Sequence, residues 1–272
     1  NAKHSASPLE MITSAWQHRD LIIQMTKREV IGRYRGSVLG IAWSFFNPLI
    51  MLAVYTLVFS TVFQAKWHTG STSKAEFALV LFIGMIVHGV LAESLINSPA
   101  LMLRNVSYVK KVVFPLEILP WVTMGSTLFH TLVSVVVWSL FYMLVNFSFQ
   151  WTVIFVPLVF LPLVLFSLGV SWMLASLGVY IRDIAQMMGV LATILLFMSP
   201  VFYPASRLPE PYQTIIYLNP LTFVIEQARD VLMWGNMPNW TGLLIATGLS
   251  ILVAWLGFFW FQKTRQGFSD VL

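Results

Sequence analysis

Cysteine is absent from the 272-residue sequence, and charged residues make up only 10% of it. Without cysteine the chain has no disulfide bonds, thiolate zinc sites or cysteine nucleophiles. Soluble domains carry about 25% charged residues, so a chain with 58% hydrophobic residues is predicted to be an integral membrane protein. The sequence also has no G-x-x-x-x-G-K-[ST] motif and therefore no P-loop for ATP.

Patterns for other chemistry are missing too. No close carboxylate pair, metal triad or nucleophile motif occurs, which argues against an enzyme. His88 and His130 are isolated histidines, for which structural contacts are expected and no metal site. The net charge of +5 does not indicate nucleic acid, because the basic residues flank apolar runs, where lipid headgroups explain them. No cleavable signal peptide is expected.

Apolar runs of about 20 residues predict spanning helices, because the strands of membrane barrels are only about 10 residues long. The fold class is therefore an all-α integral membrane protein, with residues 1–272 as one transmembrane domain. The linker 146–150 predicts a tight hairpin, and Pro157 and Pro162 should start or kink the helix after it. Pro200 disfavours helical geometry just before it, so the fifth span is expected to break within the membrane. The six predicted spans are 41–63, 77–96, 121–147, 151–180, 185–203 and 240–261.

Residues 7–36 predict an amphipathic helix in the membrane interface. Ser7 is placed as its N-cap, Pro8 as its first residue and Glu10 as the partner in a capping box. A break is expected around His18. The alternative, a surface helix on a soluble domain, has no soluble domain to pack on. The apolar residues that fall on one stripe are Leu9, Ile12, Trp16, Ile23, Val30 and Tyr34.

Lysine and arginine positions predict the orientation. With both termini in the cytoplasm, all but four of the 16 basic residues lie inside, as the positive-inside rule requires. The cytoplasmic connection 97–120 mixes charge with grouped apolar residues, so it is predicted to dock on the protein's own face or on a partner; a topogenic loop is the alternative. The outer segment 204–239 is too apolar for a free loop. It predicts two re-entrant helices separated at Asn219-Pro220.

Several side chains within these segments are singled out. Glu93, inside the second span, is expected to be near an edge, paired or protonated, because a mid-span carboxylate costs about 2.5–3.5 kcal/mol. Glu226, Arg229 and Asp230 are spaced for a local ion pair. An aromatic stripe on the first span can stack on sugar rings, although packing against neighbouring helices is the simpler explanation of the pattern alone. The stripe consists of Tyr55, Phe59 and Phe63.

A series of short motifs runs along the chain in this order: Lys27-Arg28-Glu29, Arg33-Tyr34-Arg35-Gly36-Ser37-Val38-Leu39-Gly40, Trp43, Asn47-Pro48-Leu49, Lys110-Lys111-Val112-Val113-Phe114-Pro115, Glu117 to Pro120, Arg182-Asp183-Ile184, Ser199-Pro200, Leu208-Pro209-Glu210, Leu218-Asn219-Pro220-Leu221-Thr222, Glu226 and Arg229. Their order and spacing resemble those of the membrane subunits of ABC transporters that export polysaccharides such as O antigen, capsule and teichoic acid. Leu116 departs from that pattern, since many such proteins carry a basic residue after the Phe-Pro pair.

The resemblance implies a permease in the bacterial inner membrane, working as a homodimer among membrane lipids with two copies of an ABC nucleotide-binding subunit. That partner would bind ATP and Mg, and a lipid-linked polysaccharide would pass through a channel at the dimer interface. The channel residues would be Tyr55, Phe59 and Phe63. Partner coupling would use Arg28, Arg33, Arg35, Arg104, Lys110 and Lys111. The external gate would comprise Ser199, Pro200, Asn219 and Pro220.

Three other functions remain open. An ABC permease for a drug or small lipid has the same architecture, and substrate binding separates the two. An ion-coupled secondary transporter predicts several buried charges, whereas Glu93 stands nearly alone. A membrane glycosyltransferase or acyltransferase predicts a catalytic constellation that the sequence lacks.

Overall fold

The computed structural model describes residues 6–58, 74–110, 114–148 and 150–272, and throughout this part of the chain the regular elements are helices. Short 3₁₀ segments and one π-helical segment connect longer α-helices. The α-helices are α1 (Pro8–Gln17), α2 (Arg19–Arg33), α3 (Trp43–Leu57), α4 (Lys74–Asn97), α5 (Leu101–Arg104), α6 (Val106–Val109), α7 (Leu119–Asn146), α8 (Val156–Tyr180), α9 (Ile184–Phe197), α10 (Glu210–Leu218), α11 (Pro220–Arg229), α12 (Trp240–Thr264) and α13 (Phe268–Val271). The others are η1 (Gly40–Ala42), η3 (Leu116–Ile118), η4 (Trp151–Phe155), η5 (Ala205–Arg207), η6 (Asp230–Trp234, π) and η7 (Arg265–Gly267).

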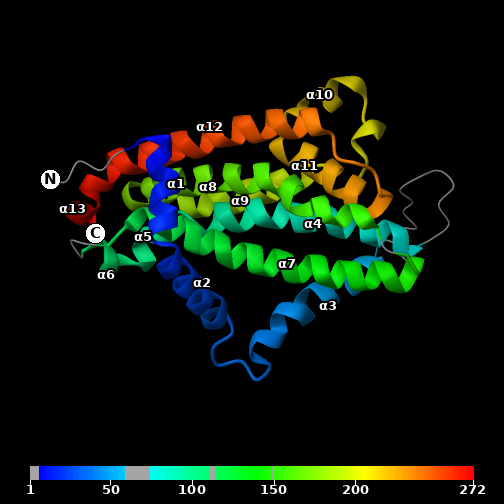
Figure 1. The fold of residues 1–272 in the computed structure, drawn as a ribbon, viewed down its shortest axis with the longest axis horizontal. Coiled ribbons are helices and arrows are strands. Elements are labelled where there is room, and N and C mark those ends of the chain that lie inside the picture. Colours follow the sequence, from blue (N-terminus) through cyan, green and yellow to red (C-terminus); the bar gives the residue numbers. More distant parts are fainter. Residues whose placement is uncertain (1–5, 59–73, 111–113, 149) are drawn as a thin grey trace.

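Helix α4 is the centre of the bundle. It packs against α3, α7, α8, α9 and α11 and runs through the middle of Figure 1. In the most apolar stretch of Ala75–Asn97, 72% of the residues are buried, whereas in that of Gly40–Leu57 only 11% are. A helix that is apolar all round is buried by neighbouring helices, whereas α3 keeps one long face uncovered.

Five helical stretches in the described residues are long and apolar enough to span a membrane: Gly40–Leu57, Ala75–Asn97, Leu116–Asn146, Trp151–Tyr180 and Trp240–Gly267. Helix α9 is apolar but has only 14 residues. Within the predicted span 185–203, the chain is helical only to Phe197, so the break expected just before Pro200 is present. The restriction that proline places on preceding residues accounts for this early end.

The structure confirms the helix end predicted near 146–150 and the break predicted at Asn219-Pro220 in the outer segment. Phe147 adopts a left-handed conformation, with φ of 51°, and ends α7. Pro157 lies in the first turn of α8, and Pro162 lies inside it. The outer segment forms α10 and α11, separated at Asn219. The side chain of Asn219 caps α11 by accepting a hydrogen bond from the Leu221 amide at 3.0 Å.

The amino-terminal helix begins and breaks where the sequence predicts. Ser7 accepts a hydrogen bond from the Glu10 amide at 3.2 Å, and the break at His18 separates α1 from α2. The single apolar stripe is only partly correct. Helix α1 buries Met11, which is not in the predicted stripe, and leaves the stripe residues Leu9, Ile12 and Trp16 exposed. In α2, the stripe residue Val30 is buried. Exposed apolar side chains on α1 are typical of a helix that meets a membrane surface.

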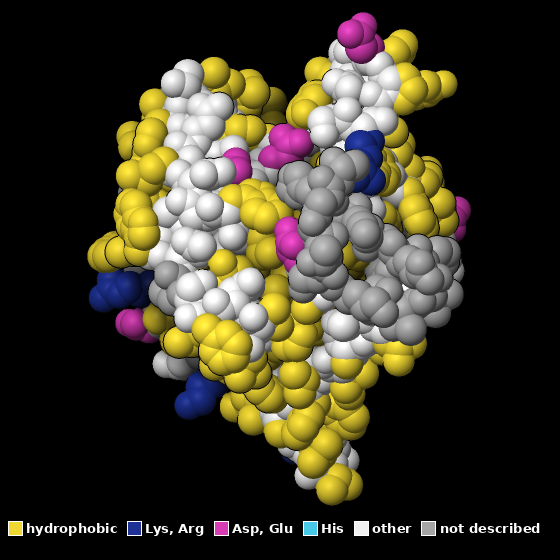
Figure 2. Space-filling model, turned by 90° about the vertical axis from the view of Figure 1, so that its right-hand side faces the viewer, with side chains coloured by type: hydrophobic (Ala, Val, Ile, Leu, Met, Phe, Trp, Pro, Cys, Tyr) yellow, Lys and Arg dark blue, Asp and Glu magenta, His cyan; other side chains and the backbone are white. Residues whose placement is uncertain are grey.

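The two ends of the molecule carry different segments. Helices α1, α5, α6 and α13 gather at one end, and α10 and α11 lie at the other, as Figure 1 shows. Helices α2 and α3 form the two arms of a V, whose tip is the bend at 34–42 and whose open side faces α7. Figure 2 looks onto the end with α10 and α11, where apolar side chains cover the flanks and charged ones are few. Such flanks suit contact with hydrocarbon or with another apolar surface.

Candidate functional site

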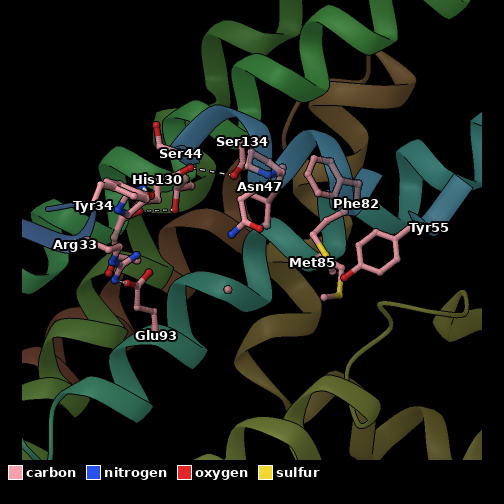
Figure 3. A pocket seen from close by; sticks show the side chains of 16 residues that line it. Arg33, Tyr34, Ser44, Asn47, Tyr55, Phe82, Met85, Glu93, His130 and Ser134 are labelled. Atoms are coloured by element: carbon pink, nitrogen blue, oxygen red, sulfur yellow. Dashed lines mark hydrogen bonds and ion pairs between the residues drawn. The ribbon is translucent and has the colours of Figure 1, made fainter. Parts of the chain in front are cut away.

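A cavity of about 290 Å³ lies between the V of α2 and α3 and the inner helices α4 and α7. Figure 3 shows that its two ends differ in chemistry. Arg33, Glu93 and His130 lie at one end, and Phe82 and Tyr55 lie at the other. The cavity exists because the bend at 34–42 turns the chain back and carries α3 away from the end of α2.

The polar end is organised by an ion pair between the guanidinium of Arg33 and the carboxylate of Glu93. The side chain of Glu93 is 21% exposed and that of Arg33 is 41% exposed, so the pair sits at the mouth of the cavity. A carboxylate within an apolar helix requires such a partner, and the expectation that Glu93 is paired is confirmed. Arg33 was assigned to partner coupling, and that role stays a prediction.

The ring of His130 forms the floor beside this pair. Its Nδ1 atom lies 3.3 Å from the hydroxyl of Tyr34, and the two rings meet edge to face. Its Nε2 atom is buried and has no hydrogen-bond partner among the described residues. A buried ring nitrogen without a partner is uncommon in proteins. His130 can therefore offer this atom to a hydroxyl or other polar group that enters the cavity.

One wall of the cavity is a line of hydroxyl groups on α7. Thr127, Thr131 and Ser134 recur about one turn apart, so they share a face of the helix. Each hydroxyl donates to a carbonyl of the preceding turn, at 3.1, 2.9 and 2.9 Å respectively. Their oxygen lone pairs remain available to accept hydrogen bonds. Sequence reasoning missed this wall, although the spacing of the hydroxyls beside His130 was a usable signal.

The opposite wall is aromatic and apolar. Tyr55 of α3 lines the cavity near Phe82 of α4, with ring centroids 6.4 Å apart, and Met85 lies between them in Figure 3. The structure thus places Tyr55 where a passing group could reach its ring. Phe59 and Phe63, the other two residues of the predicted stripe, lie outside the described residues.

Arg28 and Arg104 of the predicted coupling set come together at the opposite end from α10 and α11. Both line a second cavity of about 260 Å³ with Glu29. Arg28 donates to the hydroxyl of Tyr108 at 3.1 Å. Burial raises the pKa of Glu29, and the nearby guanidinium of Arg33 partly opposes this. Two charged segments far apart in sequence therefore share one surface.

The remaining coupling residues are less connected to this cavity. Arg35 is exposed in the bend after α2, and Lys110 is exposed at the end of α6. Lys111 lies outside the described residues. The connection itself has an inner apolar side, where Leu101 and Met102 are buried, and an outer side that carries Arg104. The inner side docks on the protein itself, as one of the two predicted alternatives required.

The predicted gate residues meet at the end of α9. The amide of Asn219 donates to the hydroxyl of Ser199 at 2.9 Å and to the carbonyl of Met198 at 3.2 Å. Pro200 follows directly, and Pro220 begins α11. The helix end leaves carbonyls without intrahelical donors, and Asn219 supplies one. The proximity of these residues is established, whereas their action as a gate stays a prediction.

Arg229 completes this cluster in a way the sequence did not reveal. The expected local attraction to Glu226 is present. The guanidinium also donates to the backbone carbonyls of Val80, Pro200 and Val201 at 3.2, 2.7 and 3.0 Å. The residue is only 4% exposed. Burial lowers its pKa to about 9, although the charge of Glu226 opposes this. The side chain therefore remains a cation at neutral pH and ties α11 to α4 and to the broken end of α9.

Within the described ranges, no group of three or more His, Asp or Glu side chains is placed to hold a metal ion.

The family model for ABC-2 type transporters matches residues 20–233. This stretch includes the cavity between α2, α3, α4 and α7 and the cluster around Arg229. The chain belongs to the ABC-2 type transporter family, a family of membrane permease subunits. The resemblance to ABC transporter permeases drawn from the motifs is thereby confirmed.

Three individual proteins are similar to this chain over most of its length. Two proteins of Klebsiella pneumoniae named O-antigen export system permease protein RfbA are 28% and 26% identical to this chain over 256 and 258 residues. Each match covers 93% of this chain and 95% of the relative. A protein of the same name from Myxococcus xanthus is 25% identical over 264 residues, covering 96% of this chain and 99% of the relative.

Proposed function

We propose that the chain is the permease subunit of an ATP-driven ABC exporter that moves a lipid-linked polysaccharide across the inner membrane. The substrate we propose is O antigen, because relatives matched over nearly their whole length are named O-antigen export permeases. Within this chain, the observation that carries the substrate class is the two-walled cavity. Hydroxyls of α7 face an aromatic wall that holds Tyr55.

A polymer of many sugars cannot be bound tightly at every step of its passage. Aromatic faces stack on sugar rings without demanding one particular sugar, and the hydroxyls of Thr131 and Ser134 can exchange hydrogen bonds with sugar hydroxyls. The single ion pair, Arg33 with Glu93, lies at the mouth and leaves the wall itself uncharged. Such a wall suits a polysaccharide that slides past it better than one that is bound tightly at one position.

The topology proposed has six spans with both termini in the cytoplasm. Helix α9, with 14 residues, is about 21 Å long and falls short of the roughly 30 Å hydrocarbon core. We assign it as the fifth of the six spans, completed by the non-helical chain around Ser199, with α10 and α11 as re-entrant helices beside it. Helix α1 then lies in the cytoplasmic interface, its exposed Trp16 towards lipid.

This chain has no P-loop for ATP, so the proposed transporter is a homodimer of the permease with two ATPase subunits. The exposed apolar face of α3, which carries Phe45 and Ile50, is the surface that a second copy would cover around a shared channel. ATP and Mg would be bound by the partner subunits. Exposed Arg104 and Lys110 lie at the same end as α1, where a cytoplasmic partner would dock.

The proposal is tested by deleting the gene in the bacterium that carries it and locating the polysaccharide. Lipid-linked polymer should accumulate inside the inner membrane and disappear from the cell surface, and the wild-type gene should restore it. The matched control is the gene with Thr247 changed to serine, a conservative change on α12 away from both cavities. Unchanged surface polysaccharide in the deletion strain would refute the proposal.

A further inference from the structure

A buried network of polar groups joins four segments at the end of the molecule that holds α1 and α13. At its centre, the carboxylate of Glu117 in η3 accepts from Arg265 at 2.7 Å and from the Ser14 hydroxyl at 3.1 Å. The side chains of Arg265 and Glu117 are 9% and 11% exposed. Arg265 also donates to Gln262 of α12 at 2.9 Å. One carboxylate thus holds α1, η3 and the end of α12 together.

The connection 97–120 is fixed to α8 at both of its ends. At its start, Gly178 of α8 lies so close to the carbonyl of Pro99 that no Cβ would fit between them. At its finish, the indole of Trp172 donates to the backbone carbonyl of Glu117 at 3.0 Å. Because both attachments are to one helix, displacement of the connection must carry α8 with it.

Helices α8 and α12 in turn move together. Gly169 and Gly257 face each other, and a Cβ on either would overlap the backbone of the other helix. At the same level as η7, the hydroxyls of Ser176 and Thr264 lie 2.6 Å apart. Small residues that allow such close backbone approach are typical of tightly packed membrane helices. The connection, α8 and α12 therefore form one mechanical unit, and the Glu117 carboxylate is its link to α12.

Stability alone does not account for a buried charge pair at this place. Moving two charges out of water costs so much that apolar residues of similar volume often stabilise as well or better. What the pair provides is a fixed geometry between η3 and η7, since the Arg265–Glu117 contact is short and directional. A fixed geometry between η3 and η7 ensures that a movement of η3 produces an equal movement of η7.

We propose that Glu117 is a positioning residue that transmits movement of the cytoplasmic connection to α8 and α12, so that ATP hydrolysis is converted into export. This inference rests on the proposed function, because it presupposes an ATPase partner on the connection. Without the Glu117–Arg265 link the partner still binds and hydrolyses ATP, but less polymer is exported for each ATP.

The test reconstitutes the full transporter with its ATPase subunits and measures ATP hydrolysis and polymer export in the same vesicles. For Glu117→Gln and for Arg265→Gln, export per ATP is expected to fall at least threefold while the ATPase still co-purifies. The exchanged pair, Glu117→Arg with Arg265→Glu, is expected to recover most of that ratio. Thr247→Val, a change on α12 outside this network, is the matched control and should keep the wild-type ratio.

A ratio unchanged in both single variants, or lowered equally in Thr247→Val, would overturn the inference. Should the variants fail to fold, the wild-type protein answers the question by itself. The chain has no cysteine, so spin labels can be placed at Ser107→Cys and Lys263→Cys. In a dimer that pairs one labelled subunit with one unlabelled subunit, they report the distance between the connection and α12. That distance should stay constant between the ATP-free and ATP-trapped states, and a change of several ångströms would overturn the inference.

Failure of the underlying function gives a different result. If the wild-type complex hydrolyses ATP but exports no polysaccharide of any kind, the proposed function is wrong. If the wild-type exports and the ratio does not respond to Glu117, only the positioning role is wrong.

Discussion

Replacing Arg229 with methionine tests how the end with α10 and α11 is held together. The change keeps an unbranched apolar stem but removes the guanidinium, which donates to the carbonyls of Val80, Pro200 and Val201 at 3.2, 2.7 and 3.0 Å. A buried acceptor that loses its donor costs about 1–3 kcal/mol. The Val80 carbonyl keeps its partner within α4, whereas the carbonyls of Pro200 and Val201 lose the guanidinium donor. With local relaxation we expect about 2–5 kcal/mol of destabilisation.

The assay is thermal unfolding of the purified protein in detergent, followed by tryptophan fluorescence. Arg229→Lys should fall between wild type and Arg229→Met, because an ammonium group cannot reproduce the planar fork that reaches three carbonyls. Arg207→Met, a change at an exposed arginine of η5, is the control and should cost under about 0.5 kcal/mol. If Arg229→Met unfolds at the same temperature as Arg207→Met, the three hydrogen bonds do not hold this end.

Three further changes probe other parts of the chain. Tyr55→Ala should reduce polymer export several-fold while dimer assembly and ATPase co-purification stay normal; loss of assembly would mean that the ring is packing and not channel wall. Lys110→Glu should weaken co-purification of the ATPase, and unchanged binding would leave the connection a topogenic loop. Because burial raises the folded-state pKa of Glu29, wild type should lose stability relative to Glu29→Gln as the pH rises from below 4.5 towards neutral; parallel pH–stability curves would contradict this.

Local patterns in the sequence were sufficient to predict the all-helical fold class and several helix boundaries. The Ser7 cap, the break at His18 and the separation of α10 from α11 at Asn219 all depend on residues within a few positions of one another. Helix-forming apolar runs and capping side chains act over the same short range. The early end of α9 was foreshadowed by Pro200, but its extent was not, because the proline rule fixes only the residue next to it.

Contacts between distant segments were beyond such patterns. The sequence predicted that Glu93 needs a partner but not that Arg33 provides it, since the two lie 60 positions apart. Arg229 was read with its neighbours on the helix, whereas its hydrogen-bond acceptors are 28 to 149 positions away. Glu117 was grouped with an exposed connection, and only the fold shows that Arg265 covers it. Each miss is a charged side chain whose partner was brought to it by helix packing.

The measurement that tests the central claim most directly is export of lipid-linked O antigen by the purified permease with its ATPase subunits in proteoliposomes. Polymer supplied on the ATPase side should become accessible on the opposite side only when hydrolysable ATP and Mg are present. Permease without the ATPase subunits should hydrolyse no ATP and move no polymer. Movement that proceeds without ATP, or follows an ion gradient instead, would contradict the account.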